Sequence, residues 1–578
     1  MNRMECVLGQ LSERTNIAID DATKADLTKR VWRKDAALWK EDEASQKIIK
    51  NSLGWLTVPD EMIGVINELT EFADLIRKRG FQTVMVCGMG GSSLCPEVLA
   101  RTFGRQSGFP ELLVLDSTDP DVLADLLNRV EIEHCLFVIA SKSGSTTEPN
   151  TFYKFWYDQL SKRVATPGEN FIAITDPGSP LVDTALELGF QRTFLNQADI
   201  GGRYSALSYF GMVPAALMGI DISKFLAHAK EAEQTCSPVM PAEKNIALQL
   251  GAVLGECARA GRDKLTLVIG DEIDTLGLWI EQLVAESTGK EGKGVLPVAS
   301  EKLGTVGNYG DDRLFVSISI GRASEEVRAN LGALAGAGHP VVYRELADVY
   351  DLGAEFFTWE FATACAGWRL GINPFDQPNV QESKDATKEL LNTFVNHGKL
   401  PDQNKLVSDD ALAIYGEADQ KQLSSDSTLA AIRSHLSTIK SGDYVALLNY
   451  VEETPEIDGE IQKIRLLLRD ATKCATTIGY GPRFLHSTGQ LHKGGPDSGV
   501  FFQITANDAV DFPVPGEPYT FSILKQAQAL GDFRSLAARG RRAIRIDLGN
   551  DTVGGLKRLG QLISDALSES DAVATSRG

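Results

Sequence analysis

Residues 83–93 read TVMVCGMGGSS, and residues 135–148 read CLFVIASKSGSTTE. Each stretch begins with an apolar run and passes directly into a loop of small and hydroxyl-bearing residues. Further apolar runs stand at residues 111–116 and 171–176, and helical patterns separate all four runs. Apolar runs without alternation are typical of strands buried on both faces, and their regular exchange with helices predicts parallel βαβ units.

The same pattern restarts further along the chain, with apolar runs at residues 265–270, 314–320 and 340–346. Two more runs, at residues 500–505 and 543–548, lie near the C-terminus. The sequence therefore predicts an α/β fold with two similar halves built on parallel sheets, a helical N-terminal segment and a C-terminal α/β extension.

We expect four parts in the chain. They are a helical segment over residues 1–60, a first domain over 61–240, a second domain over 241–398 and a C-terminal region over 399–578. Residues 399–475 are more polar and predict a largely helical stretch.

The composition excludes several classes of protein. The chain has 578 residues, with 43% hydrophobic and 24% charged residues, which is an ordinary globular balance rather than that of a disordered or fibrous chain. The 58 Lys and Arg residues against 78 Asp and Glu residues give a net charge of −20. Such a charge repels phosphate polymers, so we expect no nucleic-acid partner, and local donors must hold any phosphorylated ligand.

The sequence also predicts a cytoplasmic protein without a membrane partner. No run of 18 or more apolar residues occurs, and the first residues, MNRMECVLGQLSERTN, lack the apolar stretch of a signal peptide.

The first loop, from Gly88 to Ser93, has the features of an anion site. Its glycines allow a close backbone approach, and the helix after it presents free N–H groups. A plain strand-to-helix turn is the alternative interpretation. A second alternative is the glycine-rich loop of a dinucleotide-binding site, in which Asp116 would bind the ribose. However, Ser93 stands where that motif needs a glycine.

The second loop carries five hydroxyls, one glycine and one lysine within residues 141–147. This is more than helix capping requires, because one Ser or Thr suffices for an N-cap. Both loops follow strands of one predicted parallel sheet, and such sheets bind ligands at the carboxyl ends of their strands. No GxxxxGK[ST] motif is present, which favours a monophosphate over a nucleoside triphosphate.

Four more motifs follow the two loops in a fixed order. They are GGRYS (201–205), QLVAESTGKEGKG (282–294), NPFDQPNVQESK (373–384) and GYGPRFLHSTGQLHKGGPDSG (479–499). The ordered set resembles the phosphoglucose isomerases, a family built from two three-layer sugar-isomerase (SIS) domains. The last motif is similar to the isomerase part of transaldolase–phosphoglucose isomerase fusion proteins.

The resemblance implies an aldose–ketose isomerase acting on glucose 6-phosphate and fructose 6-phosphate in glycolysis and gluconeogenesis. It implies catalytic roles for Glu286 as the base, Arg203 beside the reacting carbons, Lys384 near the sugar oxygens and His486 in ring opening. Substrate-binding positions implied by it are Gly91, Ser92, Ser141, Lys142, Ser143, Thr146, Gln282 and Gln377. A homodimer is a further implication.

The chemistry suits these residue types. Isomerisation moves a proton between carbons 1 and 2 through a cis-enediol, and a carboxylate such as Glu286 can take and return it. Gln282 lies one helical turn before Glu286, so the two share a face. Arg203 supplies a permanent planar cation for the developing negative charge. We expect neither a metal nor a redox cofactor. Lys290 and Lys293 are expected to lie in a solvated charged turn.

One departure from the family pattern concerns His486. In shorter members the histidine segment lies between the glutamate and lysine segments, whereas His486 follows Lys384 here. Catalytic constellations are defined by geometry rather than chain order, so this order is compatible with the same site. Alternatives left open are a related isomerase that also acts on mannose 6-phosphate, a non-catalytic sugar-phosphate-binding protein and, more remotely, a nicotinamide-dependent dehydrogenase.

Overall fold

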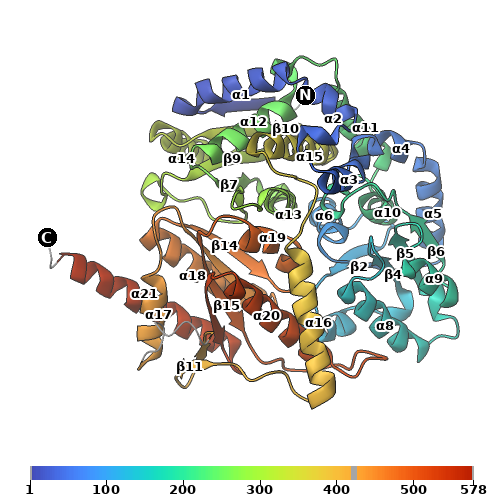
Figure 1. Cartoon of the computed structure of the whole chain (residues 1–578). Helices are drawn as coiled ribbons and strands as arrows, with labels where there is room; N and C mark the ends of the chain where they lie inside the picture. The colour runs from blue at the N-terminus through green and yellow to red at the C-terminus, as the bar shows by residue number, and fades with distance from the viewer. Residues whose placement is uncertain (1–2, 418–425, 576–578) are drawn as a thin grey trace. The chain divides into compact units, whose positions relative to one another are not determined.

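Three mixed or parallel β-sheets organise the chain, as Figure 1 shows. The structure is a computed structural model that describes residues 3–417 and 426–575. Two compact units make up the chain. The first unit comprises residues 1–116, 127–300 and 314–377, and the second comprises residues 117–126, 301–313 and 378–578.

The first sheet of unit 1 has the strand order β3-β2-β4-β5-β6, and every pair in it is parallel. Its strands are β2 (Thr83–Cys87), β3 (Glu111–Leu115), β4 (Cys135–Ala140), β5 (Phe171–Thr175) and β6 (Arg192–Leu195). The helices along this part of the chain are α5 (Ile66–Lys78), α6 (Leu94–Phe103), α7 (Pro120–Arg129), α8 (Thr147–Ser161), α9 (Pro180–Glu187) and α10 (Tyr209–Leu217). Four of the five strands coincide with the predicted apolar runs, because β2, β4 and β5 are buried along their whole length and β3 in part.

The second sheet of unit 1 has the order β1-β10-β9-β7-β8. Its strands are β1 (Arg3–Val7), β7 (Lys264–Ile269), β8 (Leu296–Val298), β9 (Arg313–Ile320) and β10 (Val341–Leu346). The helices here are α11 (Ile222–Thr235), α12 (Ile246–Arg259), α13 (Leu276–Thr288), α14 (Glu325–Gly336) and α15 (Leu352–Leu370). Strand β1 pairs antiparallel with β10 at one edge, whereas β10 and β9 pair parallel.

The N-terminal segment is helical after β1, as predicted. Its helices are α1 (Ser12–Lys24), α2 (Leu27–Trp32), α3 (Glu43–Lys50) and α4 (Val58–Ile63). Trp39 and Trp55 are buried in the core of unit 1, where Trp39 meets Phe375 edge-on and Trp55 stacks on Tyr204. One continuous apolar cluster joins residues of both sheets of this unit.

Unit 2 carries the third sheet, in the order β11-β12-β16-β15-β13-β14. Its strands are β11 (Lys405–Ser408), β12 (Ala413–Tyr415), β13 (Tyr444–Tyr450), β14 (Ala475–Tyr480), β15 (Gly499–Thr505) and β16 (Arg542–Asp547). The helices are α16 (Val380–His397), α17 (Thr428–Leu436), α18 (Pro455–Thr472), α19 (Gly489–Gly494), α20 (Phe521–Ala538) and α21 (Thr552–Thr575).

The two faces of this third sheet have different cover. Phe502 and Ile504 belong to the apolar cluster that includes α17, α18 and α21. Gln503 between them donates to the carbonyl of Ala529 on α20, at 2.9 Å. Because successive strand residues point to opposite faces, α20 covers the other face.

The expectation that residues 399–475 are largely helical is wrong for three segments. Strands β11, β12 and β13 all begin within this range. Strand β13, with the sequence YVALLNY, is buried at every position and pairs parallel with both β14 and β15. The polar helices around it dominate the composition of the range, so composition does not indicate a short buried strand there.

No helix within residues 3–417 and 426–575 combines the length and the apolar character needed to cross a membrane.

Candidate active site

The two hydroxyl-rich loops leave the same edge of the first sheet. Strands β2 and β4 are parallel neighbours, with Cys87 opposite Ile139. The loop after β2 forms the short helix η4 (Gly90–Ser92), and the loop after β4 leads into α8. The register therefore places both loops side by side at the carboxyl ends of these strands.

Hydroxyl groups of the second loop bond to one another. Ser141 Oγ donates to Thr146 Oγ1 at 3.2 Å, Ser143 and Thr146 lie 3.5 Å apart through their hydroxyls, and Ser145 Oγ donates to Ser143 Oγ at 3.0 Å. Thr146 occupies the N-cap of α8, yet its side chain makes no capping bond, and the same holds for Ser93 at the N-cap of α6. At both helix starts, the N-cap hydroxyl therefore accepts no hydrogen bond from the first backbone N–H groups. Such N–H groups can bind an anion.

Lys142 is tied to a neighbouring strand end. Its ammonium group pairs with Asp176 and donates to the carbonyl of Ala198 at 2.9 Å. Burial raises the pKa of Asp176, while Lys142 acts against that rise. The positive charge of Lys142 is therefore shared with a carboxylate beside the loop.

Gly91 allows the first loop to approach the GGRYS turn. A Cβ on Gly91 would lie 2.0 Å from the carbonyl oxygen of Gly202, which begins the short helix η7 (Gly202–Tyr204). Only a residue without a side chain fits this contact. The predicted Ser92 is buried next to it.

Helix α13 brings Glu286 into the same neighbourhood. The helix packs against both η4 and η7, and Glu286 lies near its C-terminal end with its side chain only 10% exposed. Arg203 on η7 places a guanidinium nitrogen 3.4 Å from Glu286 Oε1. Gln282, one turn earlier on α13, donates to Glu286 Oε2 at 3.3 Å. The predicted base, cation and amide thus meet in one cluster of unit 1.

The guanidinium of Arg203 is fixed on every side. It donates to Ser287 Oγ at 2.7 Å and to Gln377 Oε1 at 2.9 Å. Its remaining donor group bonds the carbonyls of Pro374 and Asp376, at 2.8 and 2.9 Å. Because these bonds hold the planar group from several directions, its position beside Glu286 is set before any substrate binds.

Lys290 lies near the site, contrary to the prediction from the sequence. The sequence predicts a solvated turn, but Lys290 is only 3% exposed and its ammonium bonds Asp376. Lys293 of the same turn is exposed, as expected. Their positions in the sequence could have distinguished the two lysines. Lys290 follows Glu286 by one helical turn, whereas Lys293 comes after the Glu291–Gly292 bend.

Lys384 and His486 belong to unit 2. Lys384 is exposed on α16, and His486 is half-buried at the end of the short helix η13 (Arg483–His486). Their part in the site of unit 1 therefore stays a prediction.

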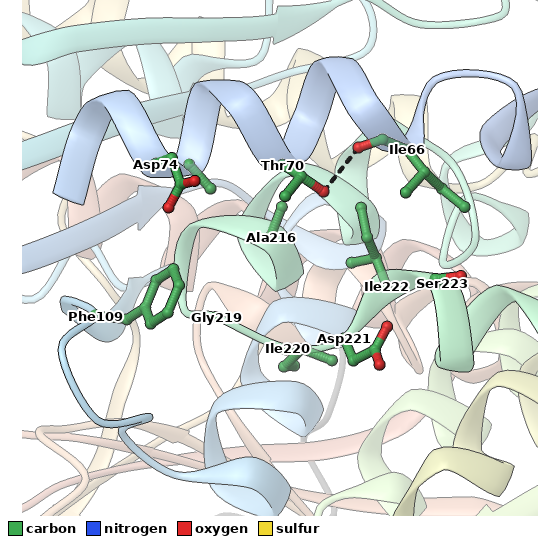
Figure 2. A pocket seen from close by; sticks show the side chains of 11 residues that line it. Ile66, Thr70, Asp74, Phe109, Ala216, Gly219, Ile220, Asp221, Ile222 and Ser223 are labelled. Carbon is green, nitrogen blue, oxygen red and sulfur yellow. Dashed lines mark hydrogen bonds between the residues drawn. The ribbon is translucent and has the colours of Figure 1, made fainter. Parts of the chain in front are cut away.

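Unit 1 also has a pocket of about 260 Å³, and none of the predicted site residues lines it. Figure 2 shows the residues that do. The pocket lies between α5, the end of α10 and the start of α11. Ile66, Ile220 and Ile222 make its lining largely apolar, and the Thr70 hydroxyl already donates to the carbonyl of Ile66 at 2.8 Å. Its two carboxylates are already engaged, Asp74 with the exposed Arg77 at 2.8 Å and Asp221 with the N–H of Lys224 at 3.0 Å, so the buried cluster around Glu286 is the better candidate for chemistry.

A carboxylate cluster in unit 2 is explained by ion pairing. Oxygens of Asp119, Asp121 and Asp508 lie within 4.8 Å of one another. The buried ammonium of Lys525 bonds Asp119 at 2.8 Å and also pairs with Asp508. Asp121 accepts the backbone N–H of Ala509 at 3.0 Å. Each carboxylate of this cluster therefore already has a donor from the protein.

Comparison with known proteins agrees with these observations. The family model described as phosphoglucose isomerase matches residues 68–307, a range that contains both loops, Arg203 and Glu286. Glucose-6-phosphate isomerase of Leptospira interrogans is 28% identical over 395 residues, which is 60% of this chain and 88% of that protein. The enzyme of the same name from Clostridium novyi is also 28% identical over 395 residues, covering 59% of this chain and 86% of that protein.

Solved structures support the fold. A hypothetical protein from Thermus thermophilus superposes with a TM-score of 0.58 at 24% identity, over 67% of this chain and 99% of that one. A glucose-6-phosphate isomerase from Chlamydia trachomatis gives a TM-score of 0.55 at 19% identity, over 68% of this chain and 89% of that one. The matched model and the curated relatives agree with the resemblance carried by the motifs: residues 68–307 of the chain are similar to the phosphoglucose isomerases, and the solved structures share the two-sheet architecture of unit 1.

Proposed function

We propose that the chain catalyses the reversible isomerisation of glucose 6-phosphate and fructose 6-phosphate. The observation that carries this proposal is the buried cluster in which the Glu286 carboxylate lies 3.4 Å from the fixed guanidinium of Arg203. A phosphate-binding protein needs neither group in this arrangement, whereas proton transfer between adjacent carbons needs both. The matched family model and the similarity to glucose-6-phosphate isomerases support the same substrate pair.

Each side chain has a role in the proposed reaction. Glu286 removes the proton from one carbon and returns it to its neighbour, and Arg203 stabilises the negative charge of the enediol intermediate. Gln282 and Gln377 orient these two groups through the bonds described above.

The phosphate is assigned to the two loops. Gly91, Ser92, Ser141, Ser143 and Thr146 supply backbone and hydroxyl donors at two helix starts, with Lys142 beside them. Donors of this kind can surround a dianion without a large net positive charge, which suits a chain of net charge −20.

Two further residues, which lie in unit 2, are assigned roles from the sequence motifs alone. The reactive form of a cyclic hexose phosphate is the open chain, and opening the ring needs proton transfer at the ring oxygen. His486 is assigned to this step because imidazole exchanges protons near neutral pH. Lys384 is assigned to the sugar oxygens. The resemblance of the motifs around them supports both assignments.

Three further proposals rest on the family and the sequence pattern. The sugar-isomerase domains span residues 61–240 and 241–398, flanked by the segments 1–60 and 399–578. Two copies form a homodimer, and the protein works in the cytoplasm. Sedimentation of the purified chain tests the dimer.

A coupled assay of fructose 6-phosphate conversion tests the activity. Wild type should turn over, and Glu286→Gln should lose about 100- to 10,000-fold in kcat while keeping its fold, because a general base contributes on that order. Glu291→Gln is the matched control, since Glu291 is an exposed carboxylate five residues away that pairs with Lys40. A fully active Glu286→Gln would reject the assignment of the base, and an inactive wild type would reject the function.

A further inference from the structure

Lys290 is placed by a tight turn directly after the helix that carries Glu286. The backbone N–H groups of Lys290 and Lys293 each donate to the other residue's carbonyl at 3.0 Å. Between them Glu291 and Gly292 adopt left-handed backbone conformations, with φ of 56° and 71°. Two consecutive central residues with positive φ are typical of a type I′ turn, which reverses the chain with only two residues. The turn thereby returns Lys290 toward the protein interior, while Lys293 remains exposed.

The ammonium group of Lys290 holds the segment that in turn holds Arg203. Lys290 Nζ donates to the Asp376 carbonyl at 2.5 Å and to Asp376 Oδ1 at 2.7 Å. The other carboxylate oxygen of Asp376 accepts Asn373 Nδ2 at 3.0 Å. The same Asp376 carbonyl accepts the guanidinium of Arg203 at 2.9 Å. One carbonyl oxygen is thus shared by two buried cations.

A buried lysine is unfavourable unless it makes strong bonds, because its charge loses hydration. An apolar side chain of similar length would fill the same space without that cost. The buried charge of Lys290 therefore indicates a functional role. Lys290 bonds the Asp376 carbonyl that also binds Arg203, and Arg203 lies beside Glu286.

We propose that Lys290 is a positioning residue for the isomerisation: it clamps residues 373–377 through Asp376 and so keeps the Arg203 guanidinium beside Glu286. This inference rests on the proposed function. It assigns no contact with substrate to Lys290, which acts through Asp376 and Arg203.

The charge on Lys290 is lost close to physiological pH. Burial and the neighbouring charge of Arg203 lower the pKa of Lys290 to about 8, while Asp376 and Glu286 oppose that change. Below this pH the clamp consists of charge-assisted hydrogen bonds. Above it the neutral amine makes weaker bonds to the same oxygens. The clamp should therefore loosen as the pH rises from 7 to 9.

Three variants test the clamp. Lys290→Met removes the charge and the donors at similar length, and Lys290→Gln keeps a donor but not the charge. Lys293→Met is the control, because Lys293 is an exposed lysine of the same turn whose ammonium donates to the carbonyl of Leu370, at 2.9 Å. We would measure kcat and KM for fructose 6-phosphate between pH 6.5 and 9, and hydrogen–deuterium exchange of peptides containing residues 371–377 without substrate.

We expect Lys290→Met to lower kcat at pH 7 by about 10- to 100-fold, with KM within about 3-fold of wild type, since a small displacement of catalytic groups costs rate on that order. The kcat of wild type divided by the kcat of Lys290→Met should fall towards 1 between pH 7 and pH 9, because the wild-type clamp loosens over this range. Exchange at residues 371–377 should accelerate in Lys290→Met and Lys290→Gln but not in Lys293→Met.

A Lys290→Met protein that matches Lys293→Met in kcat, in pH profile and in exchange would overturn the proposal. A constant rate ratio across the pH range would overturn it too, since a purely structural role moves no ionisation. If Lys290→Met does not fold, the kcat and exchange of Lys290→Gln, together with the decrease of wild-type kcat at alkaline pH, decide whether the proposal holds. A wild type without turnover rejects the proposed function, and the exchange measurement still decides whether the clamp exists.

Discussion

Arg203 is the residue on which the geometry of the candidate site depends most. Its side chain is 2% exposed, and it links Glu286 on α13 with Ser287, Gln377 and the carbonyls of residues 374 and 376. A flexible cation at this position would have to be ordered during each turnover. Because the fork is already fixed, its positive charge is available at the position where the proposed reaction would form an enediolate.

The change Arg203→Lys should therefore cost both rate and stability. A lysine keeps the charge but cannot donate in the directions of the guanidinium fork, so Ser287 Oγ, Gln377 Oε1 and the carbonyls of Pro374 and Asp376 lose the hydrogen bonds that Arg203 supplies. We expect kcat to fall by about 100- to 1,000-fold and the free energy of unfolding to fall by about 1–3 kcal/mol. Steady-state kinetics and urea unfolding measure the two effects.

Arg101→Lys provides the control for this prediction, because the Arg101 side chain is 68% exposed on α6. Its substitution should leave both quantities nearly unchanged. Wild-type kcat in Arg203→Lys would mean that charge alone suffices and that the planar fork has no role.

At the residue scale, the sequence motifs single out side chains that the structure places close together, and their catalytic roles stay predictions. The motifs identify Glu286, Gln282 and Arg203, and the structure brings the three side chains together. The prediction for Lys290 is wrong because a run of charged residues, KEGK, normally indicates solvent. Only the left-handed conformations at Glu291 and Gly292 turn Lys290 inward, and side-chain composition does not encode that direction.

At the scale of elements, the close packing of η4 against η7 brings the first of the two proposed phosphate loops next to the cluster of Arg203 and Glu286. The contact at Gly91 and Gly202 leaves no room for a side chain. Both short helices also pack against α13, so three elements distant in the sequence meet at one point of unit 1.

The change Gly91→Ala should separate these elements. The added Cβ would lie 2.0 Å from the Gly202 carbonyl, so η4 or η7 must move. Because this displacement moves the phosphate loop relative to Glu286 and Arg203, we expect kcat/KM for fructose 6-phosphate to fall by about 100-fold. Gly332→Ala is the control, since Gly332 is an exposed glycine of α14 with no atom within 4 Å of the added Cβ. Equal kinetics for both variants would show that the contact is unimportant for the site.

Prediction of elements depends on burial. Strands β2, β4, β5, β7, β9 and β10 all coincide with apolar runs, because central strands of parallel sheets are covered on both faces. Among the strands of unit 1, β1, β6 and β8 are not predicted. Each stands at an edge of its sheet. Strand β1 is mostly exposed and β8 has three residues, so neither gives an apolar run of sufficient length.

At the scale of the whole molecule, the proposed chemistry draws on both units. Unit 1 contains the two proposed phosphate loops, Arg203 and Glu286, whereas His486, the residue proposed for ring opening, lies in unit 2. The fold class follows from periodicity alone, but the contribution of unit 2 follows only from motif resemblance, since periodicity carries no information on which distant segments share a site.

The change His486→Gln tests whether unit 2 contributes. If His486 opens the sugar ring, the variant should fold normally and lose about 100-fold or more in kcat, because proton transfer by a positioned side chain contributes on that order. His397→Gln is the control, since His397 is an exposed histidine at the end of α16 in the same unit. Wild-type turnover by His486→Gln would assign ring opening to another group and leave the role of Glu286 unaffected.

Transfer of a proton by Glu286 between carbons 1 and 2 is the central claim, and isotope exchange tests it most directly. Wild type and Glu286→Gln would be incubated with fructose 6-phosphate in D₂O, and NMR would follow deuterium at carbons 1 and 2 of the sugar. We predict that wild type incorporates deuterium during isomerisation, because a carboxylate-bound proton can exchange with solvent before its return. Glu286→Gln should incorporate deuterium at least about 100-fold more slowly. Deuterium incorporation by Glu286→Gln at the wild-type rate would contradict the claim.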